Sequence, residues 1–141
     1  MRLHVGLGTF KPLEERHIAE NKLHQEWRRL TPETAEALNA ARAAGRRIVP
    51  VGTTAMRTLE SCADIDGVLH AATGPTDIFL KPGDRIRATD ALMTNFHLPG
   101  SSLFMLVCTL MGTDVMQAAY AHAIKDGYRF YSYGDACLLL P

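Results

Sequence analysis

A continuous apolar segment in the second half of the chain places the strongest constraint on its fold. Residues 103–111 read LFMLVCTLM, and a helix formed from them is apolar on every side, so it has to be buried against other elements. The segment is too short to cross a bilayer, which takes about 20 residues. It therefore requires a packed core, and 141 residues with 47% apolar content suffice for one domain, residues 1–141.

Capping and turn residues divide the chain into strands and helices. Thr31-Pro32 is typical of a helix start and Gly45 of a helix end, while Ser101 or Ser102, and Asp114, are placed to cap later helices. The predicted strands are 3–9, 46–51, 77–80, 86–96, 128–133 and 137–140, and the predicted helices are 32–44, 55–63, 102–111 and 115–125. Residues 64–73 are predicted to form a loop. The segment 13–29 is ambiguous, since 17–22 could form a helix and 23–27 a strand. This order predicts an α/β fold with a largely parallel sheet and flanking helices.

The polar stretch 89–102, directly before the apolar helix, is the first candidate site. It carries Asp90, Thr94, Asn95 and His97 near the predicted end of a strand, where α/β proteins usually bind ligands. His97 can exchange protons near neutral pH because the ordinary imidazole pKa is about 6.5. Asn95 and His97, two residues apart, share a strand face, whereas Asp90 needs a bulge to join them. The competing interpretation is a hydrogen-bonded structural histidine.

The second candidate is a helix start that follows a glycine turn. Gly52, Thr53 and Thr54 precede or open the predicted helix, with Arg57 one turn inside it. Unpaired N–H groups and the positive end of the helix dipole suit a phosphate or carboxylate there. The glycine and lysine spacing of a Walker A loop is absent. A plain threonine cap is the alternative.

Three weaker candidates remain along the chain. His24 and Glu26 share a strand face, so the carboxylate is able to orient the imidazole, although an exposed edge strand gives the same pattern. Residues 129–135, which include Tyr133 and Asp135, place aromatic rings beside an arginine, as in base-stacking surfaces, or are simply strand core. His4 lies near two glycines.

Charge and cysteine content narrow the possible partners. Lys plus Arg equals Asp plus Glu, 15 each, so RNA contact has to come from a local patch such as 28–29 or 42–47, which are otherwise solvated helix ends. The three cysteines form no C-x-x-C pair, and we expect no metal. Without a signal peptide or membrane span, the sequence predicts a cytoplasmic location.

Several motifs occur in a fixed order along the whole chain. They are HVGLGTF from His4, VGTT from Val51 with RTLE from Arg57, TDIF from Thr76 with KPG from Lys81, DAL from Asp90, TNFHLP from Thr94, YRF from Tyr128 and SYGDA from Ser132. In this order they closely resemble the C-terminal part of the S-adenosylmethionine:tRNA ribosyltransferase-isomerase family of queuosine biosynthesis. The first residues already read as core, so we expect a fragment whose N-terminal part is absent.

The resemblance implies a fold, a reaction and partners. The fold is the C-terminal part of a barrel-like α/β domain. The reaction moves the ribosyl group of the co-substrate S-adenosylmethionine onto 7-aminomethyl-7-deazaguanine in a tRNA anticodon and isomerises it to epoxyqueuosine, releasing adenine and methionine. The implied partners are that tRNA and a missing N-terminal half or a second copy of the chain.

The resemblance also implies roles for the candidate residues. Proton transfer is assigned to His97, Asp90, His24 and Glu26, and substrate binding to Gly52, Thr53, Thr54, Arg57, Thr94, Asn95, Tyr133, Asp135 and His4. Among these, the helix start is expected to hold the methionine carboxylate, and the aromatic residues to stack on a base.

Some positions depart from the family pattern. Asn21 stands where the family usually has His, Asp84 and Ile86 replace aromatic residues, and Pro50 interrupts a strand by removing a ladder donor. Three readings therefore stay open. The chain is the catalytic C-terminal half of the enzyme, or a truncated non-catalytic remnant that keeps the fold, or, more remotely, a small anion-binding module.

Overall fold

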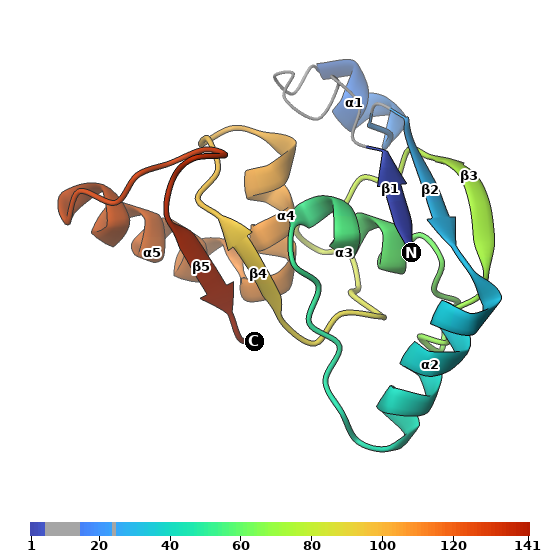
Figure 1. The fold of residues 1–141 in the computed structure, drawn as a ribbon. Coiled ribbons are helices and arrows are strands. Elements are labelled where there is room, and N and C mark those ends of the chain that lie inside the picture. The colour runs from blue at the N-terminus through green and yellow to red at the C-terminus, as the bar shows by residue number, and fades with distance from the viewer. Residues whose placement is uncertain (5–14, 24) are drawn as a thin grey trace.

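The computed structural model describes residues 1–4, 15–23 and 25–141 and divides into two parts that lie side by side in Figure 1. The first contains a three-stranded sheet with helices α1, α2 and α3, and the second a two-stranded sheet with helices α4 and α5. In chain order the elements are β1 (Arg2–His4), α1 (Glu15–Glu20), β2 (Glu26–Leu30), α2 (Pro32–Ala43), α3 (Thr53–Glu60), β3 (Ala72–Thr76), β4 (Leu92–Asn95), α4 (Ser102–Met111), α5 (Thr113–Lys125) and β5 (Ala136–Leu139).

The first sheet has the order β1-β2-β3, and both of its strand pairs are antiparallel. Leu30 at the end of β2 is buried with Ala35 of α2 and Leu59 of α3 in one apolar cluster. Thr31 caps α2, since its side chain accepts a hydrogen bond from the Thr34 N–H. The predicted cap and helix are confirmed, and the ambiguous segment before them is a helix followed by a strand.

The second sheet pairs β4 with β5 antiparallel, with Leu92 opposite Leu139. Leu106, Val107 and Cys108 of the apolar helix α4 are buried against this sheet and α5, whereas its other apolar side chains are half-buried, so the predicted burial is met only in part. Ser101 caps α4, but Gly112, not Asp114, caps α5. Within the described residues no single helix is long and apolar enough to cross a membrane, and only the pair α4 and α5, bent by 117°, passes that test together.

The predicted α/β class is confirmed, but the predicted parallel sheet is wrong. The chain between Ile48 and Gly52 runs parallel to β4 and makes only one bridge, Val51 with Met93. Met93 N–H donates to the Pro50 carbonyl at 3.1 Å, and Gly52 N–H to the Met93 carbonyl at 2.8 Å. Continuing this ladder would need an N–H at residue 50, which proline lacks. The segment predicted as a strand over 46–51 therefore stays irregular.

Other element boundaries also differ from the predictions. Residues 77–80 and 128–133 form no strand, whereas β3 forms over 72–76, from the last two residues of the predicted loop to the residue before the predicted strand 77–80. β4 covers only the last part of the predicted strand 86–96. Gly74 has a φ of 139° and Pro75 lacks a donor, so neither residue signals a strand, and β3 forms because β2 pairs with it along its whole length. Most of the predicted strand 3–9 lies outside the described residues.

Helix α3 joins the two parts and carries two buried charges. Arg57 is 4% exposed, forms an ion pair with buried Glu26 of β2, and donates to the Ile78 carbonyl at 3.2 and 3.3 Å. Glu60, also buried, accepts hydrogen bonds from the N–H groups of Arg87 (2.8 Å) and Ala88 (3.0 Å). Both charges on this helix are thus compensated by groups from other segments.

Neutralising Glu26 tests how much the fold depends on this arrangement. Glu26→Gln leaves the Arg57 guanidinium buried without its counter-charge, so we expect a loss of about 3–5 kcal/mol in the free energy of unfolding. Urea denaturation measures it. The matched control is Lys22→Gln, which breaks the Lys22–Asp77 pair from its exposed side and keeps Asp77, whose charge also acts on Arg57; it is expected to cost about 1 kcal/mol or less. Equal losses in the two variants would contradict the prediction.

Candidate active site

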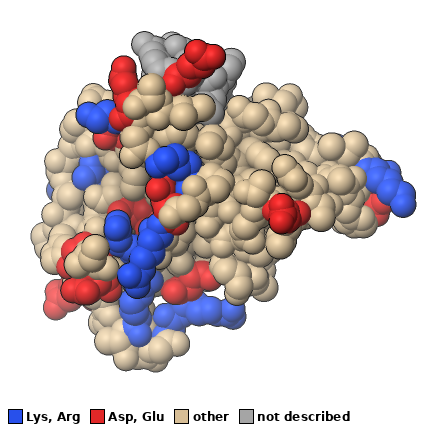
Figure 2. All heavy atoms as spheres, turned by 180° about the vertical axis from the view of Figure 1, so that it is seen from behind, with Lys and Arg blue, Asp and Glu red and all other residues tan. Residues whose placement is uncertain are grey.

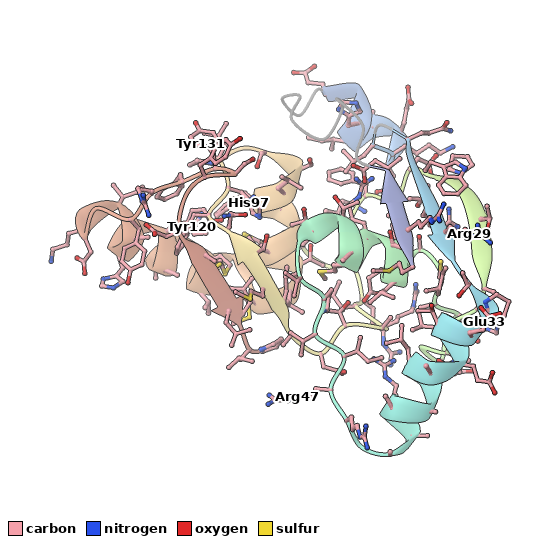
Figure 3. The ribbon with its side chains drawn as sticks, in the orientation of Figure 1. Arg29, Glu33, Arg47, His97, Tyr120 and Tyr131 are labelled. Carbon is pink, nitrogen blue, oxygen red and sulfur yellow. The ribbon has the colours of Figure 1, made fainter. Side chains whose placement is uncertain are left out.

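The carboxyl end of β4 brings Thr94 and His97 together. The Thr94 hydroxyl lies 3.0 Å from His97 Nε2, and Thr94 is buried while His97 is half-buried. Because β4 ends at Asn95, His97 lies beyond the strand, so the expected shared strand face of Asn95 and His97 does not form. The histidine instead bonds back to the third residue before it. Figure 3 shows His97 at this end of the sheet.

Burial determines the charge of His97. Desolvation lowers the pKa of its imidazole from 6.5 to about 4, so the ring is neutral at neutral pH. A neutral imidazole is available as a proton acceptor, although a weak one. Its main chain is fixed as well, since the His97 N–H donates to the Tyr120 hydroxyl at 2.9 Å. Burial raises the pKa of Tyr120 to about 12, so this hydroxyl stays protonated.

The loop 128–135 folds onto the same end of β4. Tyr131 N–H donates to the Phe96 carbonyl at 2.9 Å, and the Asn95 side-chain amide donates to the Gly134 carbonyl at 3.4 Å. The alternative that this segment is strand core is therefore wrong for most of it. Phe130 and Tyr128 pack against Phe96, at ring-centroid distances of 5.3 and 5.6 Å, whereas Tyr133 is 98% exposed.

Asp135 closes this loop by bonding to Arg129. Its carboxylate accepts hydrogen bonds from Arg129, at 2.7 Å from the main-chain N–H and 3.3 Å from the guanidinium. The main-chain hydrogen bond is the larger cause that lowers the pKa of Asp135, so the group stays ionised. Gly134 is required here, because a Cβ would lie 2.4 Å from the Arg129 carbonyl oxygen.

The amino end of α3 has no side-chain cap, so the alternative of a plain threonine cap is wrong. Gly52, with a φ of 89°, is the cap residue, and no side chain caps the helix. Thr53 is buried and Thr54 half-buried. Arg57 points into the core toward Glu26, so it adds no charge to this end. The Gly52 N–H at this end donates to the carbonyl of Met93, four residues before His97.

The remaining candidates lie away from this site. Asp90 accepts a hydrogen bond from the Ile48 N–H at 2.6 Å and lies 3.6 Å from Arg42, at the opposite end of β4 from His97. Glu26 belongs to the other sheet. His24 lies outside the described residues, and His4 is described only as the β1 residue opposite Trp27.

Two site residues were not singled out from the sequence. Tyr120 is 23 residues from His97, and no local pattern links them. Tyr131 lies in the quoted aromatic stretch, but nothing in the sequence distinguishes it from Tyr133. Among the residues that the structure describes, no group of three or more His, Cys, Asp or Glu side chains is able to hold a metal ion.

Comparison with known proteins gives the family. The model of the family described as queuosine biosynthesis protein matches residues 1–139. The chain belongs to this family. It is 82% identical, over its whole length, to an S-adenosylmethionine:tRNA ribosyltransferase-isomerase of Hyphomonas neptunium, and 61% identical, over 99% of its length, to one of Gluconacetobacter diazotrophicus. The resemblance seen in the motifs is therefore confirmed.

The family relation extends to structure but not to full length. A crystal structure of S-adenosylmethionine tRNA ribosyltransferase from Thermotoga maritima matches with a TM-score of 0.75 and 44% identity, over 82% of this chain and 40% of that one. The chain spans 40% and 39% of the two curated relatives named above. It corresponds to their C-terminal part.

The neutral state of His97 predicts a pH-dependent stability. The folded pKa of about 4 lies below the ordinary 6.5, so the unfolded chain takes up the proton first as the pH falls. Stability is therefore lost between about pH 6.5 and pH 4, by up to about 3 kcal/mol from this group. We expect His97→Gln to flatten this part of the profile in urea denaturation. His122→Gln, at an exposed site, is expected to leave it unchanged, and a wild-type slope in His97→Gln would contradict the assignment.

Proposed function

We propose that this chain is the C-terminal part of an S-adenosylmethionine:tRNA ribosyltransferase-isomerase. The reaction transfers and isomerises the ribosyl group of S-adenosylmethionine onto 7-aminomethyl-7-deazaguanine in tRNA, which gives epoxyqueuosine. The observation that carries this proposal is the 82% identity, over every residue of the chain, to a relative that bears this name. The positions that form the site at the end of β4 lie inside the matched region.

Two features of the structure suit the proposed substrates. The open amino end of α3, at Gly52, Thr53 and Thr54, fits the methionine carboxylate, because helix N–H groups without side-chain partners bind anions. The exposed ring of Tyr133, held on the loop that folds onto β4, fits a planar base. We assign no binding role to Arg57, since its charge is already paired with Glu26 in the core.

His97 is the residue that we propose for proton transfer. The reaction needs a base for the acidic proton beside the sulfonium, and a neutral imidazole accepts protons at neutral pH without first losing one. The Thr94 hydroxyl and the Tyr120 hydroxyl hold the ring and the main chain of His97. We assign no proton transfer to Asp90, whose carboxylate is hydrogen-bonded at the far end of β4.

We further propose that the chain works with the N-terminal part found in its longer relatives. One face of the β4–β5 sheet packs on the core, while the other leaves large apolar side chains uncovered. They are Val51 (72% exposed), Met93 (44%), Leu138 (58%) and Leu140 (50%). An apolar group of this kind is typical of an interface. This chain spans 40% of the Hyphomonas neptunium relative, so the remaining length of that relative, about 60%, is available to cover it.

Release of adenine from S-adenosylmethionine tests the function directly. With precursor-bearing tRNA, we expect release only when the N-terminal part of a relative is supplied as a second chain. His97→Ala is expected to lower the rate about 100- to 10,000-fold because it removes the proton acceptor. His122→Ala, an exposed histidine on α5, is the control and is expected to keep the wild-type rate. No release under any condition would leave a non-catalytic remnant, and full activity of His97→Ala would exclude it as the base.

Exposed arginines near α2 suit the tRNA backbone. Arg46 and Arg47 follow α2, and Arg85 and Arg87 precede β4. The two segments lie side by side, because Arg42 donates to the Arg87 carbonyl at 2.8 Å. Figure 2 shows basic side chains gathered on the α2 side of the molecule, with acidic side chains between them. This is the local patch that a chain without net charge needs for RNA.

The salt dependence of tRNA binding tests this patch. Arg47→Gln is expected to weaken binding to all tRNAs equally and to lower the slope of log affinity against log salt concentration by about 1, because one phosphate contact is lost. Filter binding at several salt concentrations measures it. Lys125→Gln, at the exposed end of α5, is the control, and an identical slope in both variants would contradict the placement of the patch.

The proposed reaction belongs in the cytoplasm. The three cysteines, Cys62, Cys108 and Cys137, are free thiols. Burial raises the pKa of the Cys108 and Cys137 thiols, which keeps them protonated. Such thiols are stable in a reducing compartment, where tRNA is also found.

A further inference from the structure

One residue of the loop 128–135 is held in a backbone conformation that its side chain disfavours. Tyr131 has a φ of 70°, in the left-handed region. This conformation costs a bulky residue roughly 1–2 kcal/mol of conformational free energy, whereas glycine adopts it without steric strain. Asn21 is the other non-glycine residue with positive φ among those described, but asparagine tolerates this region well. The chain therefore carries a tyrosine where its own fold favours glycine.

The surroundings of Tyr131 fix this conformation from both sides. Its N–H donates to the Phe96 carbonyl at 2.9 Å, and its carbonyl accepts from the Gly134 N–H at 3.0 Å. Phe130, just before it, packs against Tyr120 at a ring-centroid distance of 5.7 Å. At the start of the loop, the Arg129 N–H donates a hydrogen bond to the Asp135 carboxylate. Strain that is held in this way is typical of functional sites.

The ring itself contributes little to the core. Tyr131 is 58% exposed, and Tyr133, two residues along the same turn, is 98% exposed. Figure 3 shows Tyr131 at the same end of the sheet as His97, and the two are linked through Phe96, the residue before the histidine. The fold itself therefore gives no reason for an aromatic side chain at this strained and exposed position.

We propose that Tyr131 is a stacking residue that receives an unstacked nucleobase of the RNA substrate next to His97. The inference rests on the proposed function and adds a residue and a ligand class to that site. A flat aromatic face accepts any base, and one such contact contributes about 1–3 kcal/mol. The rigid turn fixes the ring before the base arrives, so little entropy is lost on binding. Tyr133 extends the same exposed surface.

Replacement by glycine separates this role from a structural one. Tyr131→Gly removes the ring and the backbone strain together, so we expect the melting temperature to stay equal or rise. The affinity for an anticodon stem-loop RNA, measured by fluorescence anisotropy with the complete two-chain complex, is expected to fall roughly 5- to 150-fold. Tyr131→Phe keeps the ring and is expected to bind within about twofold of the wild type. Ser132→Gly, at the neighbouring exposed position, is the matched control and is expected to bind normally.

The outcomes distinguish this proposal from the proposed function. RNA affinity is measured without turnover, so loss of binding in Tyr131→Gly alone supports stacking even if no adenine is released. In an active complex, Tyr131→Gly is expected to raise the KM for tRNA and to leave the KM for S-adenosylmethionine unchanged. The proposal would be overturned if Tyr131→Gly bound RNA with wild-type affinity or had a lower melting temperature than the wild type. It would also be overturned if Tyr131→Phe lost as much RNA affinity as Tyr131→Gly, or if the wild type bound no RNA. Weaker association of the two chains in Tyr131→Gly would overturn it too, since the ring would then belong to their interface.

Discussion

The position of helix α3 depends on two buried charges that only other segments are able to compensate. Arg57 reaches Glu26 of β2 and the Ile78 carbonyl, and Glu60 reaches the main chain at 87–88. A buried charge without partners costs several kcal/mol, so these contacts hold the helix against β2 on one side and the segment before β4 on the other. The open amino end of α3 is therefore fixed beside Met93 of β4. The two buried charges of α3, Arg57 and Glu60, therefore position the proposed site and take no part in its chemistry.

Strand β4 connects the two features of that site. Its middle receives the hydrogen bond from Gly52 at the start of α3, and its end continues into Thr94, Phe96 and His97. The loop 128–135 is bonded to this end through Phe96 and Asn95. The proposed sites for an anion, for proton transfer and for base stacking are thus all attached to this one short strand.

Sequence reasoning predicted the elements that rest on local signals. The Thr31 cap, the Ser101 cap and the apolar helix α4 depend on nearest neighbours, and all three are confirmed. It failed where pairing between distant segments decides the structure. β3 forms despite Gly74 and Pro75, because β2 pairs along it, and the expected parallel ladder stops at Pro50. Among the site residues, the sequence identified His97 and Thr94, but the contact of Tyr120 with His97 is a tertiary one that no spacing reveals.

The proposed site at the end of β4 is built from residues of this chain, whereas the β4–β5 sheet beside it has an uncovered apolar face. The residues that hold His97 and the loop 128–135 all lie within the described part of this chain, and their hydrogen bonds need no further segment. The sheet face with Met93 and Leu138, in contrast, leaves apolar area in water that a covering segment would remove. The geometry of the proposed site is thus local to this C-terminal part. Since electrostatic interactions with a substrate strengthen when water leaves, we expect turnover, more than the ordered arrangement of the site, to require the complementary part.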